Sequence, residues 1–149
     1  MTMGGIGHLV RRAIGSLRNV APSEHDRRVA VDVLTEGELV LWDAMDGRDR
    51  RHSLQVLARF DALCPSATVQ ERAAALLHDV GKTPAGLGWT MRIVATLVGP
   101  RGRRFAAYHS HEWVGARMLE GVSSERTREL VSGWCSDPVA DALRAADDL

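Results

Sequence analysis

The stretch over residues 68–82, TVQERAAALLHDVGK, combines a strong helix pattern with a group of polar residues at the predicted helix end. Thr68 and Glu71 have the three-residue spacing of a capping box, in which a hydroxyl and a carboxylate satisfy free backbone amides at a helix start. The alanines and leucines that follow predict a helix that ends at His78 and Asp79.

The end of this predicted helix carries residue types that suit a metal site. The neutral imidazole of His78 and the carboxylate of Asp79 are both good ligands for divalent cations. A cation held there can polarise a phosphoryl oxygen or activate water. Lys82, the only lysine among 19 lysine and arginine residues, stands close behind them.

The rest of the chain also predicts helices, since no segment alternates in the manner of a strand. Gly81 can take the left-handed conformation that closes a helix. An amphipathic stretch over residues 6–18 predicts a helix that docks onto the domain or a partner, with a membrane surface as the alternative. In the first half of the chain, further helices are predicted over residues 24–34, over 35–45 with a capping box at Thr35 and Glu38, and over 48–63 after an Asp46-Gly47 turn. In the second half, helices are predicted through 91–97 after a loop at 84–88, and over 104–120. The last two predicted helices begin at Ser123 or Ser124 and at Asp137-Pro138, and the second of these continues to the chain end.

Four sequence elements occur together in a recognisable order. They are His52, then His78-Asp79 with Gly81-Lys82, then His111 as the start of His-x-x-x-Gly-Ala, and finally Ala146-Asp147. This order resembles the HD superfamily of metal-dependent phosphohydrolases over roughly residues 48–149. The resemblance implies an all-α fold: a compact HD-domain-like helical bundle over residues 48–149, with residues 1–47 as an N-terminal helical extension.

By this resemblance, the metal ligands are His52, His78, Asp79 and Asp147. These residues fall on three separate predicted helices, and side chains that converge from facing helices are how helical bundles build metal sites. Two imidazoles and two carboxylates suit Mn, Fe, Co, Ni, Zn or Mg better than a caged calcium ion. Because residues 130–136 contain no histidine, where binuclear relatives have one, we expect one ion.

The resemblance also implies roles in catalysis for Asp79, Lys82 and His111. Lys82 would neutralise a nonbridging phosphate oxygen, with an ordinary helix-end cation as the alternative. His111 would contact substrate, donate a proton to the leaving oxygen or help to hold a second metal. Either His111 or Asp79 would manage the protons of the reaction.

Two further residues are candidates for substrate binding. His109 lies two positions before His111, so the two rings point in different directions on one helix, and either a site role or a surface role stays open for it. Arg104 ends a basic cluster over residues 101–104, which could hold phosphate groups bidentately or form a solvated loop.

These assignments predict a metal-dependent phosphohydrolase, a phosphomonoesterase or phosphodiesterase, that acts on a small phosphorylated substrate, most plausibly a nucleotide. The different class of function that we weigh against it is a degenerate, non-catalytic HD-type module for signalling or partner binding. Metal content separates the two, because an enzyme of this kind should be activated by a divalent cation.

Composition limits the partners and the compartment. The formal net charge of zero gives no reason to expect a nucleic-acid partner. No apolar run approaches the roughly 20 residues of a transmembrane helix, and the first residues do not resemble a secretory signal, so we expect a cytoplasmic protein. Cys64 and Cys135 are expected to be reduced and buried. Homo-oligomerisation stays open.

Overall fold

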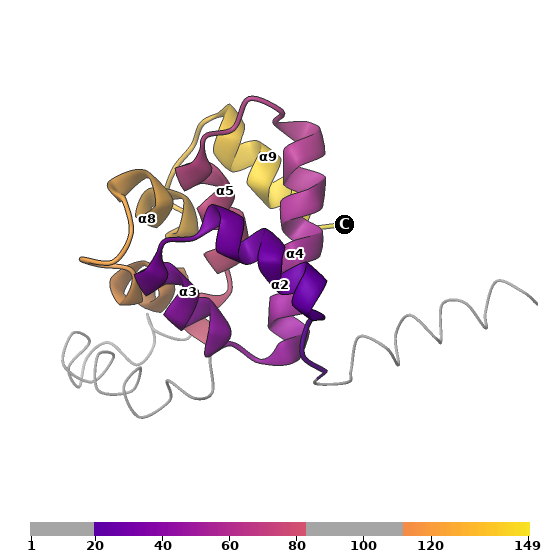
Figure 1. Ribbon diagram of the computed structural model, residues 1–149. Helices are drawn as coiled ribbons and strands as arrows, with labels where there is room; N and C mark the ends of the chain where they lie inside the picture. The colour runs from indigo at the N-terminus through magenta and orange to yellow at the C-terminus, as the bar shows by residue number, and fades with distance from the viewer. Residues whose placement is uncertain (1–19, 83–111) are drawn as a thin grey trace, which may run out of the picture.

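A computed structural model describes residues 20–82 and 112–149 of the chain, and in these ranges the fold is an all-α bundle without strands (Figure 1). The elements are α2 (Glu24–Val33), α3 (Glu36–Asp43), α4 (Gly47–Leu63), α5 (Val69–Leu77), the short 3-10 helix η1 (Val80–Lys82), α8 (Glu125–Val131) and α9 (Pro138–Asp147). Residues 112–118 form a further helix, which confirms the predicted helix in the part of 104–120 that the structure describes.

Side-chain caps set the helix starts where the sequence predicted them. Thr35 and Glu38 form a complete capping box at the start of α3, and Thr68 and Glu71 form one at the start of α5. Ser124 caps α8, and Asp137 caps α9, whose first residue is a proline. Each of these helices begins at the predicted residue because the cap is a local interaction that depends on only four consecutive residues.

The predicted left-handed conformation of Gly81 is wrong. Gly81 lies inside η1 and has no positive φ, and the amide of Lys82 donates a hydrogen bond to the carbonyl of Asp79 at 2.9 Å. Val80 is completely buried, so the chain tightens its right-handed turn here and keeps this side chain in the core. The tighter turn also brings Lys82 back toward Asp79.

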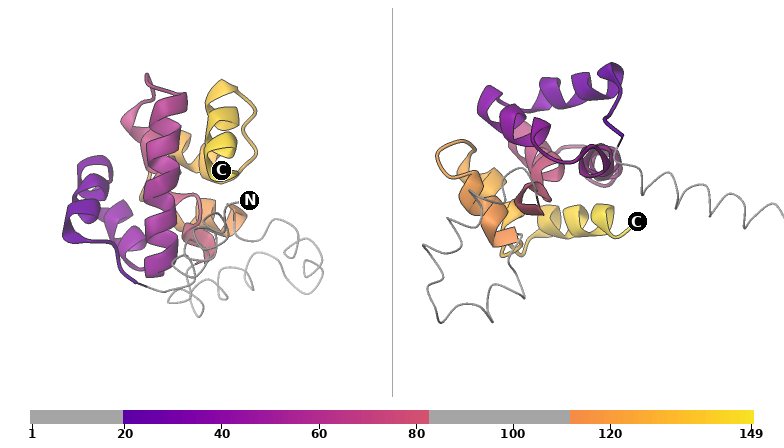
Figure 2. Two further views of the ribbon diagram at one scale, coloured as in Figure 1. Left: turned by 90° about the vertical axis from the view of Figure 1, so that its right-hand side faces the viewer. Right: turned by 90° about the horizontal axis from the view of Figure 1, so that it is seen from below.

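Helix α5 lies at the centre of the described bundle. Its residues 73–77 are all buried, and it packs against α4, α8, α2 and α3, while α9 packs against α4. In the right-hand view of Figure 2, α2 and α3 lie on one side of α4 and α5, and α9 lies on the opposite side. The central helix α5 therefore ends between α4 and α9.

Helices α2 and α3 share one hydrophobic core with the helices after residue 47. Val33, Trp42 and Met45 belong to the same buried cluster as Leu57 and Leu76. A buried hydrogen bond joins α3 to α4, because the indole nitrogen of Trp42 donates to Ser53 Oγ at 2.9 Å. The division of the chain at residue 47 stays a prediction, and among the described residues the helices on both sides of it share one core.

The remaining sequence predictions have different outcomes. The predicted helices over residues 6–18 and 91–97 lie outside the described residues. Cys64 and Cys135 form no disulfide, but both are partly exposed, so the expectation that they are buried was wrong. Among the described residues, none of the helices has both the length and the apolar character needed to cross a bilayer.

Candidate metal centre

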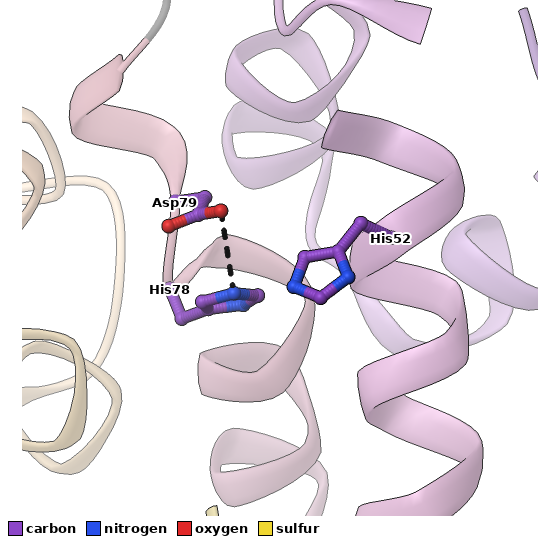
Figure 3. Close-up of side chains that lie close together, drawn as sticks. All are labelled: His52, His78 and Asp79. Atoms are coloured by element: carbon purple, nitrogen blue, oxygen red, sulfur yellow. Dashed lines mark ion pairs between the residues drawn. The ribbon is translucent and has the colours of Figure 1, made fainter. Parts of the chain in front are cut away.

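Three of the predicted ligands meet between α4 and the end of α5. Figure 3 shows His52 on α4 facing His78 and Asp79 at the end of α5. One ligand atom from each of the three residues can be chosen so that all lie within 4.8 Å of one another. The two imidazole rings meet edge to face, with centroids 5.5 Å apart.

Asp147, the last residue of α9, reaches the same place from the other side. Its Oδ1 atom lies 2.9 Å from His52 Nε2 and 3.3 Å from His78 Nε2. The guanidinium of Arg59 on α4 donates to the carbonyl of Ala146 at 3.2 Å and so fixes the backbone beside Asp147. The structure thus brings Asp147 to both imidazoles, while the group whose ligand atoms all lie within 4.8 Å of one another consists of His52, His78 and Asp79.

The hydrogen bonding of His78 identifies the nitrogen that faces the cluster. Nδ1 lies 2.8 Å from the carbonyl oxygen of Ala75, which can only accept, so Nδ1 carries the proton. In the neutral ring, Nε2 then has a lone pair. This atom is buried and has no hydrogen-bond partner among the described residues, while Asp147 Oδ1 and Asp79 Oδ2 lie 3.3 and 3.5 Å from it.

A lone pair that faces two carboxylates in a buried place needs a positive charge between them. A divalent cation supplies that charge, and a backbone carbonyl on the second nitrogen is the usual way to orient a histidine ligand. Ligands about 2.1 Å from an ion lie roughly 3.0 Å apart at right angles and roughly 3.4 Å apart in a tetrahedron. The separations of 2.9 Å between His52 and Asp147, and of 3.3 and 3.5 Å between His78 and the two carboxylates, match this range, so these donor atoms fit a metal ion.

Asp79 divides its two oxygens between the cluster and Lys82. Its side chain is 7% exposed, its Oδ2 faces His78, and its Oδ1 lies 2.7 Å from Lys82 Nζ. The lysine side chain remains 46% exposed, and an ammonium group has three donors, so one contact with Asp79 leaves donors for a further anion. Lys82 therefore orients Asp79 and still presents positive charge beside the cluster.

The electrostatics of the cluster favour charged carboxylates and a cationic neighbour. The hydrogen bond with His52 and the nearby ring of His78 hold the pKa of Asp147 far below its usual range, against the opposing effect of burial. For His78, burial lowers the pKa, but the contacts with Asp147, Asp79 and the Ala75 carbonyl outweigh it and raise the pKa above 6.5. A group of this kind binds whichever positive charge is present, a proton or a metal ion.

A cavity of about 140 Å³ opens beside the cluster. Its charged lining residues are Asp79, Lys82, Glu112, Arg144 and Asp147, and the lining also includes His78, Gly133 and apolar side chains of α8 and α9. A volume of this size is well below the roughly 300–1,000 Å³ of pockets for drug-sized ligands. The cavity suits a small group such as a phosphate, next to the atoms that could hold a metal.

Gly115, in the His-x-x-x-Gly-Ala segment, allows the helix over residues 112–118 to approach η1 closely. A Cβ atom added at Gly115 would lie 3.2 Å from a methyl group of Val80 and 3.4 Å from the amide nitrogen of Gly81. This close contact places Glu112, at the start of the same helix, on the border of the cavity.

Sequence reasoning assigned no role to Glu112 and Arg144, although both line the cavity. Arg144 stands three positions before Asp147 on α9, and this spacing puts the two residues on one helix face, a signal that could have identified it. Glu112 has no comparable local signal. The predicted site residues Arg104, His109 and His111 lie outside the described residues.

Comparisons with protein-family models, with curated proteins and with solved structures gave no match.

Proposed function

We propose that this protein is a metal-dependent phosphohydrolase that cleaves a phosphoester bond in a small nucleotide. The observation that carries the proposal is the buried Nε2 atom of His78, which faces the carboxylates of Asp79 and Asp147 beside a phosphate-sized cavity. The family resemblance supports the same activity.

The proposed centre is formed by His52, His78, Asp79 and Asp147. Bound there, a divalent cation would polarise the phosphoryl group and lower the pKa of water. The Ala75 carbonyl holds His78 in the tautomer that presents Nε2, and Arg59 holds the backbone next to Asp147. These contacts fix the donor atoms before any ion arrives, which reduces the reorganisation that binding requires.

The chain's own charged groups would handle the substrate. Lys82, at the cavity wall, would donate to a nonbridging phosphate oxygen and stabilise negative charge that develops as the ester bond breaks. Asp79 is the proposed acceptor of the proton that water loses when its oxygen attacks phosphorus. By resemblance, His111 would return a proton to the leaving ester oxygen.

Phosphate release from a panel of esters tests the activity. Purified protein is supplied in turn with Mn²⁺, Co²⁺ and Ni²⁺ and offered mononucleotides, cyclic nucleotides, nucleoside triphosphates and a chromogenic phosphodiester. Metal-dependent turnover that is lost in both His78→Ala and Asp79→Ala is the expected result. Absence of turnover across the panel in metal-loaded protein would contradict the proposal and favour a partner-binding module.

Metal content gives an independent readout. The wild-type protein should retain about one divalent ion per chain after gel filtration, as a single four-ligand centre requires. His78→Ala and Asp79→Ala should lose the ion. Unchanged metal content in both variants would show that the ion, if present, is held elsewhere.

A further inference from the structure

We infer that Glu112 forms a subsite for the alcohol half of the substrate and selects phosphate monoesters that carry hydroxyl groups and no second anionic group. This inference rests on the proposed function, because it takes the metal end of the cavity to hold the phosphate. It names the substrate class through Glu112, a further lining residue of the same cavity.

The first argument concerns the charges of the cavity lining. Lys82 is paired with Asp79 at 2.7 Å, Arg144 with Asp141, and Asp147 with the two imidazoles. Within residues 20–82 and 112–149, Glu112 is the charged lining residue that makes neither an ion pair nor a hydrogen bond. Its carboxylate accepts hydrogen bonds and donates none, so the groups that it can recognise are donors.

The second argument concerns Gly133, which allows the carboxylate of Glu112 to lie against the cavity wall. A Cβ atom added at Gly133 would lie 2.7 Å from Glu112 Oε2 and 3.1 Å from its carboxyl carbon. The φ of Gly133 is +69°, a conformation that strains any residue with a side chain. Gly133 therefore supplies both the turn and the space that the carboxylate occupies.

The third argument is the size of the cavity. A volume of about 140 Å³ takes a phosphate and the first atoms of its ester, but no drug-sized ligand. Because Lys82 and Glu112 line the same small cavity, the atoms that follow a phosphate bound at Lys82 would lie near Glu112. Hydroxyl groups on these atoms can donate to the carboxylate, whereas a carboxylate or second phosphate there meets like charge.

Three phosphate monoesters of similar size separate these effects: propyl phosphate, glycerol 3-phosphate and 3-phosphoglycerate. The first has no hydroxyl groups, the second has two, and the third has one hydroxyl group and a carboxylate in place of the other. Binding is measured by calorimetry with protein in saturating Mn²⁺, and phosphate release is measured separately. The wild-type protein should prefer glycerol 3-phosphate to propyl phosphate by about tenfold, as one hydrogen bond to a charged group provides, and should reject 3-phosphoglycerate.

Two variants of Glu112 separate the effect of its hydrogen-bond acceptor from the effect of its negative charge. Glu112→Gln keeps an acceptor of the same shape, so rejection of 3-phosphoglycerate should weaken by about tenfold while the preference for glycerol 3-phosphate survives in part. Glu112→Ala should remove both. The matched control is Glu120→Gln, because Glu120 is exposed, pairs with Arg117 and is absent from the cavity lining.

The outcomes separate this inference from the proposed activity. Hydrolysis with ratios that are identical in wild type and Glu112→Gln would overturn the subsite and leave the activity standing, with Glu112 serving only the helix start. Binding that depends on Glu112 without hydrolysis would support the subsite and contradict the activity. Failure of the wild-type protein to bind any of the three esters would overturn the subsite. If Glu112→Ala does not fold, the Glu112→Gln data with 3-phosphoglycerate decide.

Discussion

His52 Nε2 and Asp147 Oδ1 lie 2.9 Å apart, although 95 positions separate the two residues in the chain. The contact joins the first half of α4 to the last residue of α9. The Asp147 side chain is 44% exposed, and it is held by imidazoles from two other helices.

Asp147 and its neighbour Asp148 offer a matched pair for testing this ligand. Asp147→Asn removes the charge at the cluster, and we expect metal affinity to fall by at least about 10- to 100-fold, the cost of losing a well-placed group around a metal. Asp148→Asn, which changes an exposed carboxylate one position later, should leave the affinity unchanged. Competition with a fluorescent chelator measures both. Equal losses of metal affinity in the two variants would show that Asp147 acts only through its negative charge and is not a ligand.

Substitution of Lys82 should affect turnover far more than metal stoichiometry. In Lys82→Ala the proposed donor to the phosphate is lost, which should cost about 2–4 kcal/mol in the free energy of activation, while the four proposed metal ligands remain. Metal analysis and steady-state kinetics measure the two effects. Wild-type kinetics would show that Lys82 acts only as a helix-end cation. Loss of the ion in Lys82→Ala would show instead that its 2.7 Å contact with Asp79 is required to hold the centre.

The buried hydrogen bond between Trp42 and Ser53 should stabilise the start of α4. Ser53→Ala leaves the indole N–H without its acceptor in a place where both residues are completely buried, so the free energy of unfolding should fall by about 1–3 kcal/mol. Ser66→Ala, at an exposed turn, should change it by less than about 0.5 kcal/mol. Urea unfolding measures both. Equal stability of the two variants would mean that the hydrogen bond contributes nothing net.

Acid should weaken the link between α5, α8 and α9 that Arg126 forms with Glu71 and Asp137. Burial raises the pKa of Glu71, but hydrogen bonds from the Thr68 amide and Arg126 outweigh it and lower the pKa below 4.5. The pKa of Asp137 is lowered too, chiefly by Arg126. Because both native pKa values are depressed, their contribution is present above about pH 4.5 and is lost as pH falls through the native values.

Thermal unfolding from about pH 6 to about pH 3 tests this pH dependence. Arg126→Gln should unfold at a lower temperature at the upper pH, and its curve should fall less steeply on acidification than that of the wild type. Arg117→Gln, which removes an exposed pair with Glu120, is the control and should follow the wild-type slope. A parallel slope in Arg126→Gln would exclude Arg126 as the source of the acid sensitivity.

The helices could be predicted because their signals are local. Thr35 with Glu38, and Thr68 with Glu71, specify helix starts within four residues, and the structure has the helices there. Gly81 was misjudged because its conformation depends on the burial of Val80, which only the tertiary packing decides. Local pattern fixes where a helix begins more surely than how it ends.

The candidate site could be predicted only as far as a family order was visible. That order named His52, His78, Asp79 and Asp147, whose proximity is a property of the bundle. It gave no hint of Glu112, whose place at the cavity follows from the close approach of Gly115 to η1 and from the bare backbone at Gly133. Contacts of this kind depend on long-range packing, so the spacing of residues in the sequence does not predict them.

Helices α2 and α3 share one hydrophobic core with α5. Trp42 and Val33 cover the same buried helix whose end presents His78. A fragment that starts at residue 48 would expose that apolar surface to water, and aggregation would compete with folding. Removal of the residues before 48 would thus disturb the proposed metal centre from a distance, although all of its proposed ligands would remain in the chain.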